Sequence, residues 1–122
     1  MEVSEVLESP GGYYIVQRIQ PISVRHILIS WRGNRRVPRV KRSRADAQTL
    51  AGDIHKKLRL GESFESLLRQ SDDKISPGGQ YTDIAPEYMV KEFSAVAFKL
   101  KINQISGVVE TPFGYHIIQR TK

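Results

Sequence analysis

The 122-residue chain contains no cysteine. This absence excludes disulfide bonds, thiolate nucleophiles and cysteine-ligated metal centres. It leaves the compartment open, because a chain without thiols can work in reducing or in oxidising surroundings. Only three histidines are present, and His55 is predicted to lie on a helix apart from the other two, so we expect neither a metal site nor a cofactor.

The chain also lacks any apolar run long enough to span a bilayer, so we expect no membrane span. Its hydrophobic fraction of 39% and its charged fraction of 26% are typical of a globular domain. A chain of this length fits one domain and can bury a real core.

Acidic residues are missing from the stretch between residues 32 and 44, although the whole chain has a net charge of only +6. The basic residues of this stretch are Arg32, Arg35, Arg36, Arg39, Lys41, Arg42 and Arg44. A cluster of this kind attracts phosphate, acidic peptide or nucleic acid. The simpler interpretation is a solvated loop.

Two segments with one pattern stand near the two ends of the chain. Residues 9–18 and residues 111–120 each begin with a turn containing proline and glycine and continue as a mostly apolar strand. His116 lies inside the second copy, at the position where the first copy has Tyr14. This contrast suggests that His116 does more than fill space in a sheet.

The spacing of apolar residues predicts an α+β domain with helices packed around a mainly antiparallel sheet. The predicted elements, in chain order, are strands at 3–7 and 13–19 joined by a turn at Pro10–Gly11–Gly12, a central strand at 22–30, a helix from a Ser43 cap to Gly61, a short helix at 64–70, a strand at 81–84, a helix starting at Pro86, and strands at 105–109 and 115–121. The first two strands form an N-terminal β-hairpin.

Five blocks of sequence carry a resemblance to a known family. They are residues 25–29 (RHILI), 61–64 (GESF) leading to 71–73 (SDD), 77–79 (PGG), 93–100 (FSAVAFKL) and 105–116 (ISGVVETPFGYH). In this order they resemble the parvulin-type peptidyl-prolyl cis/trans isomerases, or rotamases, and the match runs from about Val24 to Arg120. The resemblance implies a four-stranded antiparallel sheet surrounded by helices, with the N-terminal hairpin as an addition.

The resemblance also implies the site residues. The catalytic group would be a histidine pair on neighbouring central strands, His26 and His116, with Asp73 and Thr111 as its partners. The substrate-binding residues would be Met89 and Phe93 in a proline pocket, Tyr81 and Phe113 on its rim, and Arg35 and Arg36 as the grip on a phosphate or acidic side chain before proline. A single strand histidine usually belongs to the core, but two in adjacent strands favour a site.

Spacing alone favours a core role for Met89 and Phe93, and only the resemblance places them in a proline pocket. Met89 and Phe93 are four residues apart in the predicted third helix, which would place them on one face. They could grip a pyrrolidine ring or be ordinary core residues. Three positions depart from the family pattern: Thr82 replaces a glycine, Val90 stands where a glutamine often lines the site, and Asn103 replaces a glycine in a position where asparagine tolerates a left-handed conformation.

The implied function is isomerisation of X–Pro bonds in polypeptides, with a preference for acidic or phosphorylated residues before proline, in support of protein folding. The alternatives are a non-catalytic peptide-binding or chaperone module and a basic nucleic-acid-binding adaptor. We expect a monomer whose partners are proline-containing polypeptides, including acidic or phosphorylated segments, and we do not expect nucleic acid.

The expected domain division places a hairpin extension at residues 1–20 and the isomerase domain at residues 21–122. The hairpin could equally be the end of a preceding isomerase unit in a longer chain. If the segment belongs to a longer exported chain we expect a bacterial periplasmic or cell-envelope location, and otherwise a cytoplasmic one.

Overall fold

The structure is a computed structural model that describes residues 2–9, 12–73 and 79–122, and for its first two strands it describes the backbone only. The elements follow in the order β1 (Glu2–Ser9), β2 (Gly12–Ile19), β3 (Ile22–Ile29), α1 (Arg44–Arg59), α2 (Phe64–Leu67), the 3-10 turn η1 (Leu68–Gln70), β4 (Gln80–Ile84), the 3-10 turn η3 (Pro86–Tyr88), α3 (Lys91–Ala97), β5 (Val109–Thr111) and β6 (Gly114–Arg120).

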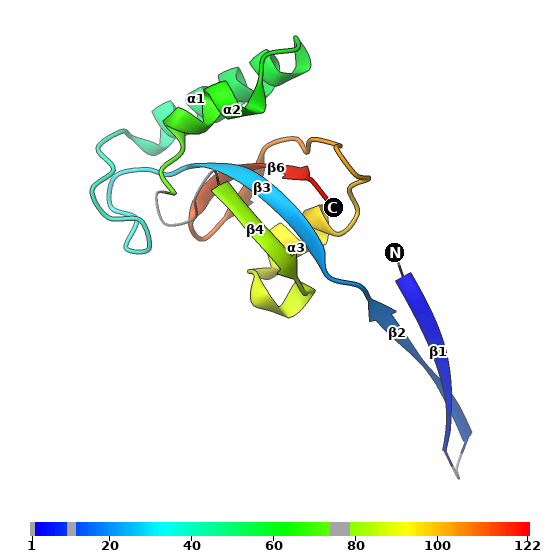
Figure 1. The fold of residues 1–122 in the computed structure, drawn as a ribbon. Coiled ribbons are helices and arrows are strands. Elements are labelled where there is room, and N and C mark those ends of the chain that lie inside the picture. The colour runs from blue at the N-terminus through cyan, green and yellow to red at the C-terminus, as the bar shows by residue number, and fades with distance from the viewer. Residues whose placement is uncertain (1, 10–11, 74–78) are drawn as a thin grey trace.

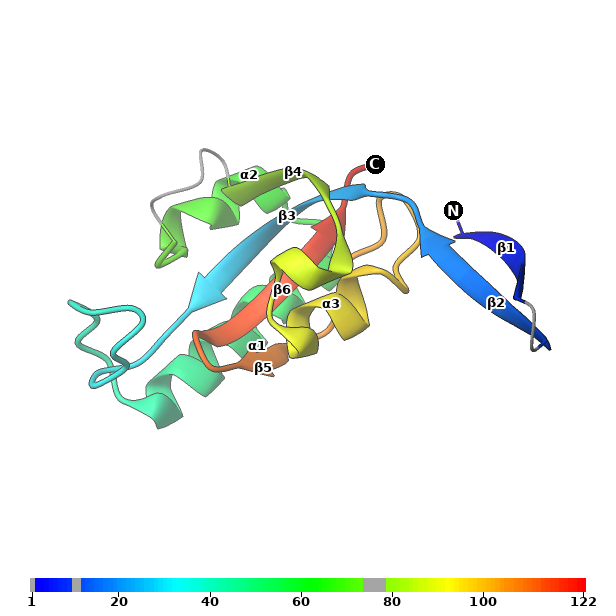
Figure 2. The same cartoon turned by 90° about the horizontal axis from the view of Figure 1, so that it is seen from below.

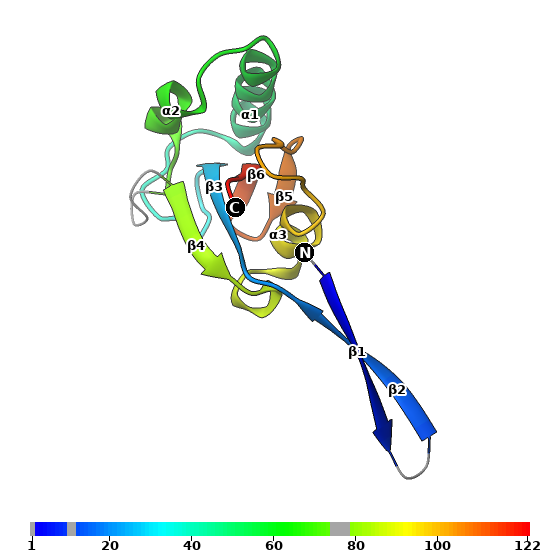
Figure 3. The same cartoon turned by 45° about the vertical axis from the view of Figure 1, so that its right-hand side comes forward.

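A four-stranded antiparallel sheet in the order β4-β3-β6-β5 forms the centre of the fold (Figure 1, Figure 3). β3 and β6 are its two inner strands and pair from Val24↔Arg120 to Ile29↔Tyr115. The predicted central strand at residues 22–30 is therefore confirmed. The predicted α+β fold, with a four-stranded antiparallel sheet among helices, is confirmed as well.

The two faces of this sheet are covered by different helices, because successive strand residues point to opposite sides. On one side, Ile27, Ile29, Tyr115 and Ile117 pack with residues of α1 and α2, among them Ala47, Ala51, Ile54 and Phe64. On the other side, Ile22, Val24 and Ile118 pack with Phe93, Ala97 and Leu100 in and after α3. Figure 2 shows this layering from below, with α3 in front of β6 and α1 behind it.

Helix α1 begins and ends where its sequence predicts. The Ser43 hydroxyl accepts a hydrogen bond from the backbone N–H of Asp46, which satisfies one donor of the first turn. Gly61 follows the last turn with a φ of +98°, a conformation that glycine adopts without strain. Among the helices that the structure describes, none is long and apolar enough to cross a membrane.

The predicted strand at residues 105–109 is wrong. Ile105 forms only an isolated bridge with Gln119, and β5 begins at Val109. The reason is Ser106, whose hydroxyl accepts the hydrogen bond from the N–H of Ile118 that a continuous strand would give to a backbone carbonyl. The predicted left-handed conformation of Asn103 is confirmed, since its φ is 71°.

The predicted third helix starting at Pro86 is also wrong in its first part. Pro86 opens η3, Met89 is extended with φ −120° and ψ 159°, and α3 begins only at Lys91. The Pro86 carbonyl accepts a hydrogen bond from the Ser94 hydroxyl, so the turn lies beside α3 instead of continuing into it. Met89 and Phe93 therefore do not share a face of one helix.

The N-terminal hairpin is confirmed. β1 and β2 pair antiparallel along their whole length, from Glu2↔Ile19 to Ser9↔Gly12. Pro10 and Gly11 of the predicted turn lie outside the described residues. Figure 1 shows the hairpin extending away from the four-stranded sheet.

Candidate active site

His26 and His116 lie side by side on the two inner strands. His26 stands opposite Ile118 and His116 opposite Leu28, so the two rings are diagonal neighbours on the face toward α3. Their Nδ1 atoms are 3.0 Å apart, and the rings are stacked with an interplanar angle of 17°. Both side chains are buried, so each ring nitrogen needs a partner within the protein.

Each histidine finds that second partner in a polar side chain. His26 Nε2 lies 2.7 Å from Asp73 Oδ2, and Thr111 Oγ1 lies 2.7 Å from His116 Nε2. The Tyr81 hydroxyl donates to the same Asp73 oxygen at 2.7 Å, and the Phe113 N–H donates to Thr111 Oγ1 at 3.1 Å. The result is one continuous chain of hydrogen bonds from Phe113 to Tyr81.

The protonation states of the rings decide which atom donates in each of these hydrogen bonds. Burial, and then the charge that His26 can carry, lower the pKa of His116 from its ordinary 6.5 to about 3, so its ring is neutral near pH 7. With a neutral His26 and an ionised Asp73, only one set of tautomers satisfies every contact. Thr111 then donates to His116 Nε2, His116 Nδ1–H donates to His26 Nδ1, and His26 Nε2–H donates to Asp73.

Tyr81 closes the carboxylate end of the chain. Burial and the hydrogen bond to Asp73 raise the pKa of Tyr81 well above its ordinary value of 10, so the phenol remains a donor. Asp73 thus accepts from a phenol and an imidazole. These two donors orient one carboxylate oxygen.

Phe93 forms the apolar wall beside the histidine pair. It is fully buried and meets the rings of His26 and His116 edge to face, at centroid distances of 5.7 and 5.3 Å. Met89 packs into the same cluster of apolar side chains. A polar chain and an apolar wall therefore adjoin at one point of the sheet.

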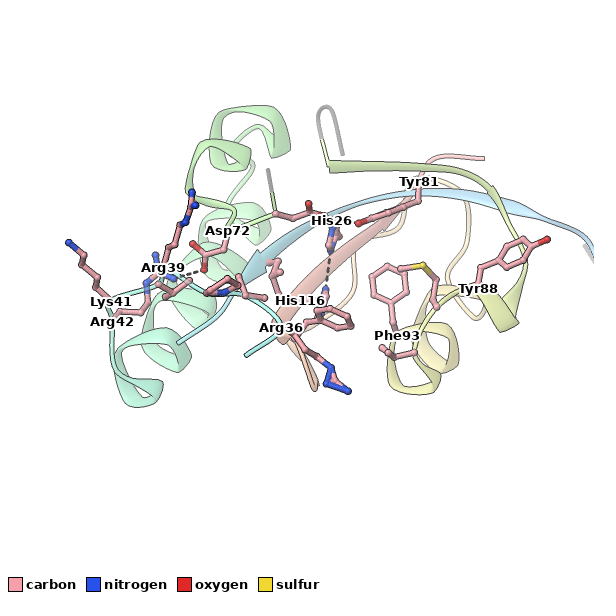
Figure 4. A pocket seen from close by; sticks show the side chains of 18 residues that line it. His26, Arg36, Arg39, Lys41, Arg42, Asp72, Tyr81, Tyr88, Phe93 and His116 are labelled. Carbon is pink, nitrogen blue, oxygen red and sulfur yellow. Dashed lines mark hydrogen bonds and ion pairs between the residues drawn. The ribbon is translucent and has the colours of Figure 1, made fainter. Parts of the chain in front are cut away.

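A cavity of about 970 Å³ opens over this point. It is lined by His26, Leu28, Arg36, Val37, Pro38, Arg39, Val40, Lys41, Arg42, Asp72, Asp73, Tyr81, Tyr88, Met89, Val90, Phe93, Phe113 and His116. Figure 4 shows Arg39, Lys41, Arg42 and Asp72 at one end, Phe93 and Tyr88 at the other, and the histidine pair between them. The cavity thus has a basic end and an aromatic end.

The basic loop, residues 32–42, is attached to the cavity through two contacts. The Asn34 side-chain amide donates to the carbonyls of Pro112 and Phe113 at 3.0 and 3.1 Å, beside Thr111. The Arg36 guanidinium lies 5.5 Å from the centre of the Phe113 ring, within range of a cation–π contact. Arg36 is therefore held at the rim of the cavity.

The turn before β6 depends on Gly114. Its φ is 142°, and a Cβ atom there would lie 2.7 Å from the carbonyl oxygen of Ile29. Glycine alone allows this close approach. The turn at Gly114 then folds Thr111 back so that its hydroxyl reaches the His116 ring.

The structure brings together most of the site residues expected from the sequence. His26, Asp73, Thr111, His116 and Tyr81 are joined by hydrogen bonds. Met89, Phe93, Phe113 and Arg36 line the cavity beside them. Arg35 is exposed and is not among the described residues that line the cavity.

Other lining residues were not predicted as site residues, notably Leu28, Tyr88, Asp72 and residues 37–42 of the basic loop. Leu28 could have been found from the sequence, because strand residues two apart share a face and Leu28 follows His26 by two. No pattern in the sequence marks Tyr88 as a residue of the cavity. Among the residues that the structure describes, no three His, Asp or Glu side chains gather as metal ligands do.

Comparison with known proteins identifies the family of the chain. A family model described as the PPIC-type PPIase domain matches residues 15–122. Foldase protein PrsA of Bacillus subtilis is 43% identical over 81 residues, which cover 64% of this chain and 27% of PrsA. Chaperone SurA of Chromohalobacter salexigens is 34% identical over 134 aligned positions, which cover 97% of this chain and 29% of SurA.

A solved structure of the peptidylprolyl isomerase PrsA from Bacillus anthracis superposes with a TM-score of 0.65 at 35% identity, covering 84% of this chain and 41% of that one. The chain spans about a quarter of the length of the curated relatives it matches. The family model covers nearly all of the chain, and the histidine pair lies within the matched region. The chain therefore belongs to the PPIC-type peptidyl-prolyl cis/trans isomerases, the parvulin family.

Proposed function

We propose that this domain catalyses cis/trans isomerisation of X–Pro bonds in polypeptides at the cavity over β3 and β6. The observation that carries the proposal is the contact between the His26–His116 hydrogen-bonded pair and the apolar wall of Phe93. This arrangement offers a polar surface and an apolar surface to one bound group. An X–Pro amide, with its polar carbonyl and its apolar ring, fits both.

The chemistry requires neither a nucleophile nor a cofactor. Exchange of the two isomers must cross a barrier of about 18–20 kcal/mol, at whose top the amide is twisted and its resonance is lost. No covalent bond is made or broken. The protein accelerates the reaction if it binds the twisted amide more tightly than the planar one.

Phe93 and Met89 would hold the proline ring, with Tyr81 and Phe113 at the rim. Because Phe93 is fully buried and contacts both imidazoles, it keeps its position when the ring binds. The carbonyl before proline then rotates against a fixed ring. Holding one half of the amide accelerates exchange to the extent that the rotated carbonyl makes better contacts with the site than the planar one does.

His26, His116, Asp73 and Thr111 would set the field in which the amide twists. Their hydrogen bonds place the two imidazoles in line, ending on the Asp73 carboxylate. Dipoles that are oriented before the reaction need no reorganisation as the charge on the amide changes. We assign the two histidines an orienting role in this network.

The preference for an acidic or phosphorylated residue before proline belongs to the same proposal. Arg36, Arg39 and Lys41 line the basic end of the cavity, and all three are exposed. A guanidinium binds a phosphate or carboxylate with two parallel hydrogen bonds. Arg36 is the better placed of the two arginines expected to bind the anion, because it lies on the Phe113 ring.

Assistance to protein folding is also proposed. Relatives of this chain carry the names foldase and chaperone. The cavity of about 970 Å³ extends from the basic loop past the histidine pair to Tyr88 (Figure 4), which suits an extended polypeptide better than a small molecule. Partly folded chains with exposed X–Pro bonds would be its substrates.

A protease-coupled assay with Glu-Pro and Leu-Pro peptides tests the proposal. We expect acceleration above the spontaneous rate with both peptides, a higher rate with Glu-Pro, and strong loss of activity in Phe93→Ala and His116→Ala. No acceleration by the folded wild-type chain would leave a non-catalytic peptide-binding module. Binding of the same peptides, measured separately by fluorescence anisotropy, would identify that outcome.

A further inference from the structure

The segment from Ser71 to Asp73 runs beside the end of β3, beyond the residues that pair with β4. The N–H of Asp72 donates to the carbonyl of Leu28 at 2.7 Å, and the N–H of Leu28 donates to the Ser71 hydroxyl at 3.0 Å. β4 itself pairs with β3 only from Ile22 to Arg25. Asp73 is therefore presented to His26 from a short segment that needs its own support.

Arg42 supplies part of that support from the end of the basic loop. Its Nη1 donates to the carbonyl of Ser30 at 3.0 Å and to Asp72 Oδ2 at 2.5 Å. The same Asp72 oxygen accepts the N–H of Ser30 at 2.7 Å. The Arg42 and Asp72 side chains are 27% and 15% exposed, so the ion pair is shielded from solvent more than a surface pair is.

The charge balance explains why this pair matters for Asp73. Asp72 and Asp73 are consecutive carboxylates, and both line the cavity. Arg42 neutralises Asp72, which leaves Asp73 as the carboxylate that accepts from His26 Nε2 at 2.7 Å. Without Arg42, Asp72 would be a partly buried charge lacking its ion-pair partner, and such a charge moves toward solvent or another donor.

Asp73 is tied to the same support through the backbone. Its N–H donates to the Ser71 hydroxyl at 3.3 Å, so a shift of the Ser71–Asp72 segment shifts Asp73. Gly79, where the described chain resumes, also lies close to His26, because a Cβ there would be 2.5 Å from the His26 carbonyl oxygen.

We propose that Arg42 is a positioning residue of the isomerase, and that its ion pair with Asp72 holds the Asp73 carboxylate on His26. The inference rests on the proposed function, since it assigns Asp73 to the working network. It separates Arg42 from Arg36, Arg39 and Lys41, which are exposed at the basic end and would bind the anionic side chain of a substrate. The basic loop then has two roles, substrate binding and support of Asp73.

The test compares Arg42→Gln with Arg44→Gln in the full chain. Arg44 is a matched control: it also forms an ion pair, with Glu110 at 2.9 Å, and its loss removes the same charge, but both side chains are more than half exposed and it does not line the cavity. The constants are measured with a Leu-Pro peptide, so that anion binding does not contribute, and with a Glu-Pro peptide to detect anion binding. We expect kcat to fall about 10- to 100-fold in Arg42→Gln with KM changed by less than about twofold, and both constants to stay within about twofold in Arg44→Gln.

A second readout does not depend on activity. The ¹⁵N chemical shifts of the His26 and His116 side chains report which ring nitrogen carries the proton. We expect these shifts to change in Arg42→Gln, to remain as in the wild type in Arg44→Gln, and to be largely restored in Arg42→Lys. If Arg42→Gln does not fold, Asp72→Asn takes its place, because asparagine keeps an oxygen for the Ser30 N–H and removes the charge.

Unchanged kcat together with unchanged imidazole shifts in folded Arg42→Gln would overturn the proposal. A rise in KM for Glu-Pro peptides alone would also overturn it, since it would make Arg42 an anion-binding residue. If the wild-type chain does not accelerate isomerisation, the proposed function fails, but the imidazole shifts still decide whether Arg42 holds Asp73 on His26.

Discussion

The two faces of β3 and β6 differ in chemistry although they are built from alternating residues of the same strands. Toward α1 the strands present Ile27 and Ile117, both fully buried among apolar side chains. Toward α3 they present His26 and His116, which are buried as deeply but form a chain of hydrogen bonds. A shift of one residue in either strand would exchange the two sets.

The difference between the two faces explains how a small domain remains stable with a buried polar site. Burying a polar group without a partner costs about 1–3 kcal/mol, and here every imidazole nitrogen has one. The apolar face meanwhile holds the two inner strands on α1. We therefore expect substitutions on the α1 face to change stability, and substitutions on the α3 face to change activity and its pH dependence.

The largest effect on stability should come from Ile117→Ala. Ile117 has no exposed surface and packs in the α1 cluster, so its truncation leaves a cavity that the surrounding side chains cannot fill. We expect the free energy of unfolding in urea to fall by about 2–5 kcal/mol. The kcat for a Leu-Pro peptide, measured where the variant remains folded, should stay within about twofold of the wild type. A folded Ile117→Ala variant with no activity would show that the two faces are not separable.

The next effect concerns His116 and pH. Its pKa is about 3 in the folded chain, against 6.5 for an ordinary histidine. Above pH 6.5 both states hold a neutral ring. As the pH falls from about 6.5 toward 3, the unfolded chain takes up a proton that the folded chain does not, so the free energy of unfolding falls by up to about 1.4 kcal/mol per pH unit.

The measurement is urea unfolding between about pH 7 and pH 5, with His116→Gln as the control. Glutamine removes the titrating ring, while His26, Asp73 and Tyr81 remain in both proteins. The stability of the wild type should approach that of the variant, or fall below it, as the pH drops. If the free energy of unfolding varied with pH in the same way in both proteins, the pKa of His116 would be the same in the folded and unfolded states, and the prediction would be wrong.

A structural feature can be predicted from the sequence when the residues that cause it are neighbours along the chain. The apolar run at residues 22–30 predicts a central strand from its own residues. The Ser43 cap and Gly61 likewise act within one turn of helix. These elements were predicted because each depends on neighbouring residues alone. The pairing of His26 with His116 was implied by the family resemblance, because a sequence alone does not set the register between two strands.

Contacts between distant residues were predicted only where the family resemblance implied them, as for His26 and His116. The break at Met89 depends on the Ser94 hydroxyl reaching back to Pro86, and the missing strand at residues 105–109 on the Ser106 hydroxyl reaching Ile118. The Arg42–Asp72 pair joins residues 30 positions apart. No periodicity marks such contacts, because the tertiary fold alone brings their partners together.

A smaller effect is expected at the basic end of the cavity. In Arg36→Ala the ratio of kcat/KM for Glu-Pro over Leu-Pro should fall about two- to fivefold, as for the loss of one exposed charge contact. Arg35→Ala is the matched control, because it removes the same charge from an exposed residue outside the cavity lining. Equal losses in the two variants would assign the preference to the general positive field of the loop and not to Arg36.

The smallest effect is expected from removing the N-terminal hairpin. We propose that residues 1–20 are an extension of an isomerase domain at residues 21–122. In the described sheets β1 pairs with β2 alone, whereas β3 pairs with β4 and β6, so truncation before Gln20 leaves the four-stranded sheet with its hydrogen bonds. We expect kcat/KM for a Leu-Pro peptide to stay within about twofold, and the urea midpoint to change less than it does in Ile117→Ala. Loss of activity in a folded truncated chain would contradict the domain division, because it would mean that the site over β3 and β6 requires residues from the hairpin.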